Sequence, residues 1–78
     1  MITFQELYDY INGIVSHVLF EYKKKECGID PLSHTEFDVW YGEKEEIMPS
    51  VESVFSTPFF DGKSLTEIFT EIAPTIDW

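Results

Sequence analysis

The chain has 78 residues and a formal net charge of −10, from 15 acidic residues against 5 lysines and no arginine. Proteins that grip nucleic acid or an anionic membrane need clustered basic side chains, so we expect direct binding to neither. Apolar residues make up 44% and aromatic residues 17% of the chain, which argues against a disordered acidic tail. The composition predicts a single compact acidic domain, 1–78, near the lower size limit for a self-sufficient core.

The few cysteine and histidine residues limit cofactor and metal chemistry. Cys27 is the lone cysteine, so no intrachain disulfide can form. Together with His17 and His34 it falls short of the four ligands that a zinc site uses. Residues 1–20 carry Glu6 and Asp9 where a secretory signal would carry basic residues. These features predict a cytoplasmic protein without a cofactor or metal.

The first predicted element is a long helix over about 4–26. Thr3 and Glu6 have the spacing of a capping box, and Lys23–Lys25 suit the negative end of a helix dipole. Gly28 is a suitable residue to follow the helix end. Such a helix is about 35 Å long. Its predicted core-facing stripe contains Phe4, Leu7, Tyr8, Ile11, Ile14, Val15, Val18, Leu19 and Tyr22.

The middle of the chain predicts a small β-hairpin. Residues 29–36 have the composition of a loop. Phe37, Val39 and Tyr41 alternate with polar or amphipathic residues, which predicts a strand over 37–41. We expect a turn over 42–46 and a short return strand at 47–48. Because an isolated hairpin is marginally stable, this hairpin over about 37–48 must pack on the long helix.

The last third predicts one or two short helices. Pro49 and Ser50 introduce an apolar spacing over 51–55, which Thr57-Pro58 interrupts. Ser64 and Glu67 form a second capping box ahead of another apolar spacing, which ends before Pro74. The predicted fold class is therefore α+β, with a long N-terminal helix, a small hairpin and short C-terminal helices.

Gly62-Lys63-Ser64 resembles the end of a phosphate-binding loop. That loop also requires a glycine five residues before Gly62, and Thr57 stands there. Asp61 would in addition face the phosphate with like charge. We interpret the segment as a turn at Asp61-Gly62 that leads into the helix N-cap at Ser64.

No pattern of catalytic residues stands out. His17 and His34 lack a serine or cysteine at a recognisable catalytic spacing. Acid–base catalysis by carboxylates needs one member to be desolvated, whereas the acidic residues of 43–46 lie in a polar turn. We therefore expect that the protein is not an enzyme.

Two features point instead to binding of another protein. Phe20 falls on the outer side of the predicted long helix, where an exposed aromatic can anchor a partner. The predicted stripe and Phe20 also favour weak homodimer formation. The acidic residues that we assign to a partner-binding patch are Glu43, Glu45, Glu46, Asp61, Glu67 and Glu71.

The small size, the acidity and the missing arginine are similar to those of small phage-borne or mobile-element inhibitors, such as anti-CRISPR, anti-restriction and uracil-glycosylase-inhibitor proteins. Many of those place carboxylates where the phosphates of a nucleic acid would lie. The resemblance implies a non-catalytic module that inhibits a basic, nucleic-acid-binding protein partner. The alternative is a structural or accessory subunit of phage or mobile-element type that associates through apolar surface.

Overall fold

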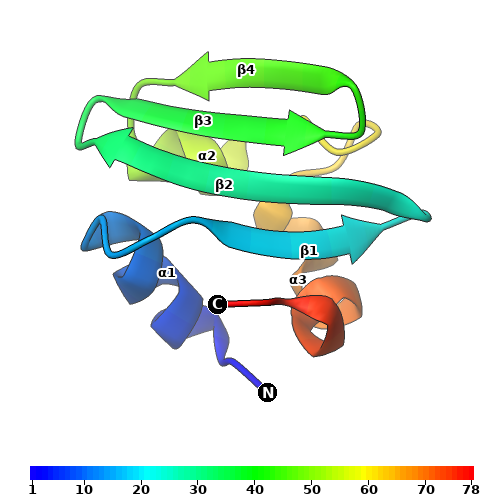
Figure 1. The fold of residues 1–78 in the computed structure, drawn as a ribbon. Helices are drawn as coiled ribbons and strands as arrows, with labels where there is room; N and C mark the ends of the chain where they lie inside the picture. The colour runs from blue at the N-terminus through cyan, green and yellow to red at the C-terminus, as the bar shows by residue number, and fades with distance from the viewer.

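A computed structural model describes residues 1–78 as one helix, a four-stranded sheet and two further short helices (Figure 1). A short 3₁₀ turn follows the last helix. In chain order the elements are α1 (Phe4–Asn12), β1 (Val18–Tyr22), β2 (Lys25–Ser33), β3 (Glu36–Tyr41), β4 (Lys44–Met48), α2 (Val51–Ser56), α3 (Leu65–Ile72) and η1 (Ala73–Thr75).

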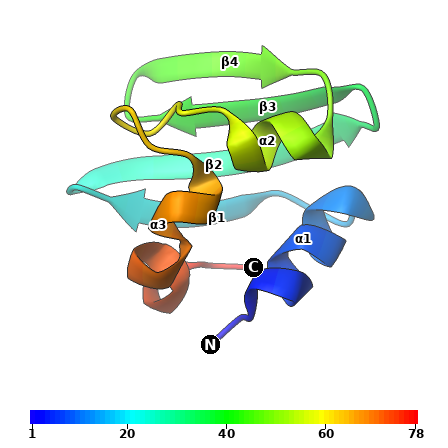
Figure 2. The same ribbon diagram turned by 180° about the vertical axis from the view of Figure 1, so that it is seen from behind.

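The four strands form an antiparallel meander in the order β1-β2-β3-β4. The helices lie on one face of this sheet, and the other face is uncovered, as the two opposite views show (Figures 1 and 2). The molecule is therefore a two-layer α+β structure. An antiparallel sheet commonly has one solvated face, and here that face becomes the candidate site.

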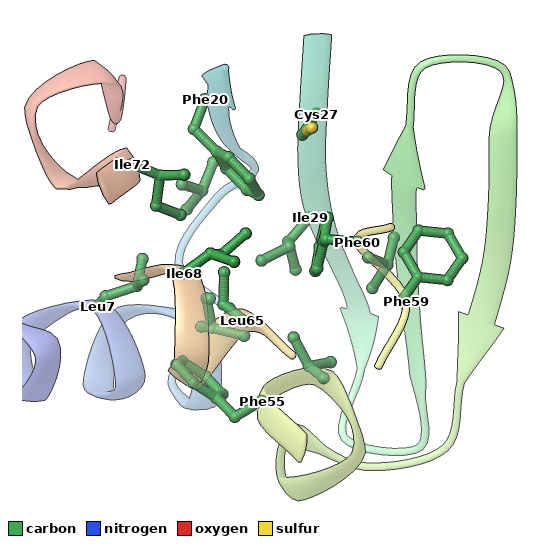
Figure 3. Packing of buried hydrophobic residues seen from close by; sticks show 14 of the residues in the cluster. Leu7, Phe20, Cys27, Ile29, Phe55, Phe59, Phe60, Leu65, Ile68 and Ile72 are labelled. Atoms are coloured by element: carbon green, nitrogen blue, oxygen red, sulfur yellow. The ribbon is translucent and has the colours of Figure 1, made fainter. Parts of the chain in front are cut away.

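The core lies between the sheet and the helices. Strand side chains such as Phe20 and Ile29 point toward Leu65 and Ile68 of α3, and Phe60 packs among them (Figure 3). The centroids of the Phe20 and Phe60 rings are 5.6 Å apart. Nineteen buried residues form one cluster, so a single continuous core stabilises both layers.

The prediction of a long helix over 4–26 is wrong beyond its first turns. The capping box is present, because Glu6 N–H donates to Thr3 Oγ1 and Thr3 N–H donates to the Glu6 carboxylate. However, α1 ends at Asn12, and Ile14 has a φ of 52°, which breaks the helix. The molecule measures 28 × 26 × 17 Å, so a helix of about 35 Å would not fit within it.

The second half of the predicted helix is the first β-hairpin. Val18, Phe20 and Tyr22 are buried and alternate with exposed Leu19 and Glu21, which is the period of a strand. Residues 23–24 then form a two-residue turn with φ values of 52° and 64°. Positive φ at both central positions is the geometry of a type I′ turn. The strands β1 and β2 therefore replace a helix that the apolar spacing also permitted.

The prediction of a hairpin over 37–48 is right in position but describes only half of the sheet. The strands β3 and β4 pair from Phe37↔Met48 to Tyr41↔Lys44. The expected loop over 29–36 is instead largely strand, because β2 continues to Ser33 and pairs with β3, with an irregularity between Pro31 and Ser33. A four-stranded sheet thus replaces the small hairpin.

The C-terminal helices follow the predicted signals. Ser50 caps α2, and Ser64 forms a complete capping box with Glu67 at the start of α3. Asp61 and Gly62 have φ values of 55° and 81°, and Phe60 and Lys63 pair across them. The segment that resembles a phosphate loop is therefore a tight turn ahead of a helix cap.

The C-terminal segment closes the outer edge of β1. Leu19 and Asp77 exchange two backbone hydrogen bonds, of 3.0 and 2.7 Å. Beside them, Glu21 N–H donates to the hydroxyl of Thr75 over 3.1 Å. The opposite edge, β4, has no such partner strand. None of the helices is both long and apolar enough to cross a membrane.

Candidate functional site

The uncovered face of the sheet is acidic. Side chains alternate along each strand, so the residues that pair across the strands share one face. The helical layer covers the face of Phe20 and Val39, and the opposite face carries the residues between them. We call this opposite surface the acidic sheet face. It is made of the carboxylates Glu21, Glu26, Asp30, Asp38, Glu45 and Asp77, with Leu19, Trp40 and Ile47 among them.

Two pairs of carboxylates stand directly opposite each other on this face. Glu21 pairs with Glu26 across β1 and β2, and Asp30 pairs with Asp38 across β2 and β3. Like charges in opposite positions destabilise a sheet. The folding of the chain therefore does not benefit from this arrangement, whereas a bound cation would relieve the repulsion.

A third contact joins Asp38 to Glu45 on the next strand. The pKa of Glu45 is raised, first because its protonated carboxyl group can hydrogen bond to Asp38 and second because the two charges repel. In addition, Asp38 Oδ1 is buried and has no hydrogen-bond partner. A buried acceptor without a donor is costly. A ligand that donates a hydrogen bond to Asp38 Oδ1 would therefore be favourable at this side of the face.

Trp40 lies over Gly28 at the centre of the face. A Cβ atom on Gly28 would be 2.1 Å from Cζ2 of the indole ring, so only glycine leaves room for the ring there. Pairing also places Leu19 beside Gly28, and Glu45 on the other side of Trp40. The row therefore has an apolar centre with carboxylates beyond it.

Next to the indole ring there is a hollow of about 250 Å³. Leu19 and Trp40 give it apolar walls, and Glu21, Glu26 and Asp77 add carboxylates. Thr75 and Asp77 belong to the C-terminal segment that closes β1, so this segment forms one wall. The hollow is smaller than the 300–1,000 Å³ or so that is usual for drug-sized ligands and cofactors.

All of the lysines lie away from the centre of this face. Lys23 and Lys24 form the β1–β2 turn, Lys25 and Lys44 begin strands, and Lys63 lies in the loop ahead of α3. Lys23 Nζ is 2.8 Å from Asp61, in the one ion pair of the structure. This contact raises the pKa of Lys23 and lowers the pKa of Asp61, with smaller effects on Asp61 from Lys25 and Lys44. No lysine neutralises the acidic sheet face.

The structure does not bring the six predicted carboxylates together. Only Glu45 lies on the acidic sheet face. Glu43 lies in the β3–β4 turn, and Glu46 points to the opposite side of β4. Asp61 is paired with Lys23. The other two, Glu67 and Glu71, belong to α3 in the helical layer.

Phe20 is not an exposed anchor. It is 5% exposed and packs in the core. The long helix that would have presented an uncovered apolar stripe is also absent. Both features from which we predicted a weak homodimer are therefore missing from the structure.

Sequence reasoning missed most of the acidic sheet face. Glu21, Glu26, Asp30 and Asp77 were not among the predicted residues, because β1 and β2 were not recognised as strands. The available signal was the alternation in 18–22, where every second residue is apolar and buried. The alternation that predicted the strand over 37–41 already put Asp38 and Trp40 on one side of that strand, but Asp38 was not assigned to the predicted patch.

Cys27, His17 and His34 are the thiol and imidazole groups of the chain. Burial raises the pKa of the Cys27 thiol to about 11, so it is protonated and weakly nucleophilic at neutral pH. His17 and His34 are exposed. No group of three or more histidine, cysteine or acidic side chains is placed to hold a metal ion.

In comparisons with known proteins, no family model matches the chain, and no curated protein or solved structure matches it.

Proposed function

We propose that this chain is a non-catalytic binding module whose acidic sheet face docks onto a basic surface of a partner protein. The observation that carries the proposal is the uncovered sheet face, which has six carboxylates, no lysine among them, and a centre made of the partly exposed Trp40 and the exposed Leu19 and Ile47. Protein interfaces commonly combine such an apolar centre with a polar rim. The face has both parts.

The charge of the face would act mainly on the rate of association. A surface with one sign of charge steers an oppositely charged partner and raises the association rate. A basic surface of this kind is typical of proteins that bind nucleic acid. We therefore propose that the partner is a nucleic-acid-binding protein and that the chain inhibits it by occupying the surface that binds phosphates.

The alternative is an accessory subunit that docks through apolar contacts. Leu19, Ile47 and Trp78 are 38%, 50% and 54% exposed, so the structure offers apolar groups for such a contact. This contact would be insensitive to salt and to competing nucleic acid. The two candidate functions therefore make opposite predictions.

The test compares Glu45→Lys with Glu46→Lys. The two residues are neighbours on β4 and make the same change in charge, but they point to opposite sides of the sheet. A basic nucleic-acid-binding partner, captured on the immobilised chain, is used to measure association rates as the salt rises from about 50 to 500 mM.

The docking proposal predicts that Glu45→Lys slows association by about ten-fold and that Glu46→Lys has a much smaller effect. It also predicts that free duplex DNA competes with the chain. An association rate that does not change with salt, or equal effects of the two variants, would overturn the acidic sheet face as the docking surface. The apolar alternative is supported if Ile47→Ser abolishes a salt-insensitive complex.

A further inference from the structure

We infer that the hollow beside Trp40 is a socket for an arginine side chain of the partner. This inference rests on the proposed function and deepens it, because it names the group that the acidic sheet face recognises. Of the eight residues that line the socket, the argument uses Leu19, Glu21, Glu26, Trp40, Thr75 and Asp77. Four features favour an arginine side chain as the ligand. They are the size of the socket, its aromatic wall, its negative charge and its lack of an internal cation.

The size of the hollow suits a single side chain of a partner. Its volume of about 250 Å³ is below the range in which proteins enclose cofactors and drug-sized molecules. It also opens at the surface of a sheet, where a flat protein surface can insert a single long residue. The hollow therefore suits an anchor residue of a partner better than a free metabolite.

The aromatic wall favours a planar cation. Trp40 lies over Gly28 and is partly exposed, and the absence of a side chain on Gly28 lets the ring lie close to the strand. Tryptophan is the aromatic residue that attracts cations most strongly, and a guanidinium can also stack on its face. A lysine ammonium is compact and more strongly hydrated, so it gains less from the same wall.

Three carboxylates on two sides of the hollow can accept hydrogen bonds from a guanidinium. Glu21 and Glu26 oppose each other across β1 and β2, and Asp77 lies on the C-terminal segment beyond Leu19. None of the three has an ion-pair partner in the chain. A guanidinium has five N–H donors in a fixed fork, so it can reach more than one of these carboxylates while it stacks on the ring. Its binding would also relieve the repulsion within the Glu21–Glu26 pair.

The chain itself cannot supply the occupant. It contains no arginine, so neither an internal side chain nor a second copy can fill the socket with a guanidinium. Beside the β1–β2 turn, Lys23 pairs with Asp61 and Lys25 lies over the Tyr41 ring on the covered side of the sheet. Lys24 makes no ion pair with the carboxylates of the socket. A guanidinium in the socket must therefore come from a different protein.

The experiment uses two defined probes, hexa-arginine and hexa-lysine peptides of equal charge, with the full chain. Affinities are measured at about 100 mM salt, where exposed charges are partly screened. The signals are the Trp40 indole N–H and the backbone amides of β1 and β2 in NMR spectra. We expect the arginine peptide to bind about five-fold more tightly than the lysine peptide, with the largest shifts at Trp40 and Gly28.

Two variants assign the preference to the socket. Trp40→Leu keeps an apolar side chain but removes the aromatic face, so it should equalise the two affinities while salt-dependent binding of both peptides remains. Glu26→Gln removes one carboxylate without changing the shape of the socket and should weaken both peptides, the arginine peptide more. Glu26→Gln removes a like-charged contact with Glu21, so it should unfold at the wild-type temperature or above, and it keeps the test informative if Trp40→Leu disturbs the fold.

The outcomes separate this inference from the function on which it rests. Equal affinities for the two peptides, or shifts that map away from Trp40, overturn the arginine socket and leave the acidic sheet face as a docking surface. If neither peptide binds at low salt, the docking function and the socket are both overturned.

Discussion

At the scale of single residues, the acidic sheet face depends on a few side chains that do not help the chain to fold. The Asp30–Asp38 pair sets like charges opposite each other, and Glu45 adds a third carboxylate beside Asp38. Gly28 contributes by having no side chain, because any Cβ atom there would meet the Trp40 ring. The repulsion among these carboxylates is a cost to the fold, and under the proposed function a basic partner would offset it.

Glu45 gives a pH-dependent test of this view. Its pKa is raised in the folded state because of Asp38. The folded chain therefore holds the Glu45 proton more tightly than the unfolded chain, and the stability that this proton provides is lost as the pH rises through the folded pKa. We expect Glu45→Gln, which cannot ionise, to be more stable than the wild type at pH 7, and the difference to disappear near pH 4.

Thermal unfolding between about pH 4 and pH 7 measures this difference. Glu46→Gln is the matched control, because it makes the same substitution on the same strand but faces Val39 in the pairing rather than a carboxylate row. A gain for Glu45→Gln that persisted unchanged at pH 4 would contradict the role of Asp38.

At the scale of elements, the turns determine the architecture. The β1–β2 turn is made by Lys23 and Lys24, both with positive φ, although glycine and asparagine are the usual residues there. The β3–β4 turn contains Gly42, with a φ of 61°, and this turn was visible in the sequence. The two turns hold the sheet together from the same end (Figure 1).

Lys24 provides a second test. A residue other than glycine in the left-handed region costs about 1–2 kcal/mol, and glycine loses about 0.5–1 kcal/mol through its larger entropy when unfolded. Lys24→Gly should therefore stabilise the fold by about 0.5–1 kcal/mol, while Lys23 keeps its pair with Asp61. Urea unfolding measures the change. Lys24→Ala removes the same charge but keeps the backbone strain, so an equal gain in that variant would show that charge, not backbone conformation, is responsible.

These turns also explain how much of the fold the sequence could predict. Both capping boxes, the short helix after Pro49 and Ser50, and the 37–41 strand are local signals, and the structure confirms them. The helix over 4–26 was wrong because the apolar residues of 18–22 satisfy a helical spacing as well as a strand alternation. The turn that decides between the two has lysines where glycine would be expected. Of the acidic sheet face, only Glu45 was predicted, since the face exists only when β1 and β2 are paired.

At the scale of the whole molecule, the charges are separated. The lysines lie toward the end of the sheet that holds the β1–β2 and β3–β4 turns, where Lys23, Lys25 and Lys44 act on Asp61. The carboxylates are the only charged groups of the acidic sheet face. This separation makes the charge distribution asymmetric. A basic partner would be attracted to the acidic sheet face and repelled by the lysines at the end that holds the two turns.

This separation predicts a conflict between stability and binding. Glu26→Lys replaces a like-charged pair with an opposite-charged pair beside Glu21, so we expect the melting temperature to rise by about 2–4 °C. The same change should weaken binding of a basic partner by about ten-fold, because it puts a cation into the acidic sheet face.

Glu71→Lys is the matched control for this prediction. It also relieves a like-charged contact, with Glu67 one turn earlier in α3, but it lies in the helical layer. Calorimetry and binding measurements should show a gain in stability for both variants and a loss of binding for Glu26→Lys only. Equal loss of binding in the two variants would mean that total charge, and not the sheet face, drives association.

The closure of the β1 edge by the last residues has a practical consequence for anyone who uses the chain as bait. A tag or linker fused after Trp78 begins at the wall of the hollow, one residue beyond Asp77. Attachment to a resin through that end would crowd the approach of a partner. A fusion ahead of Met1, which is 90% exposed and leads through Ile2 into the helical layer, leaves the sheet face open. The orientation of the bait therefore determines what a capture experiment can find.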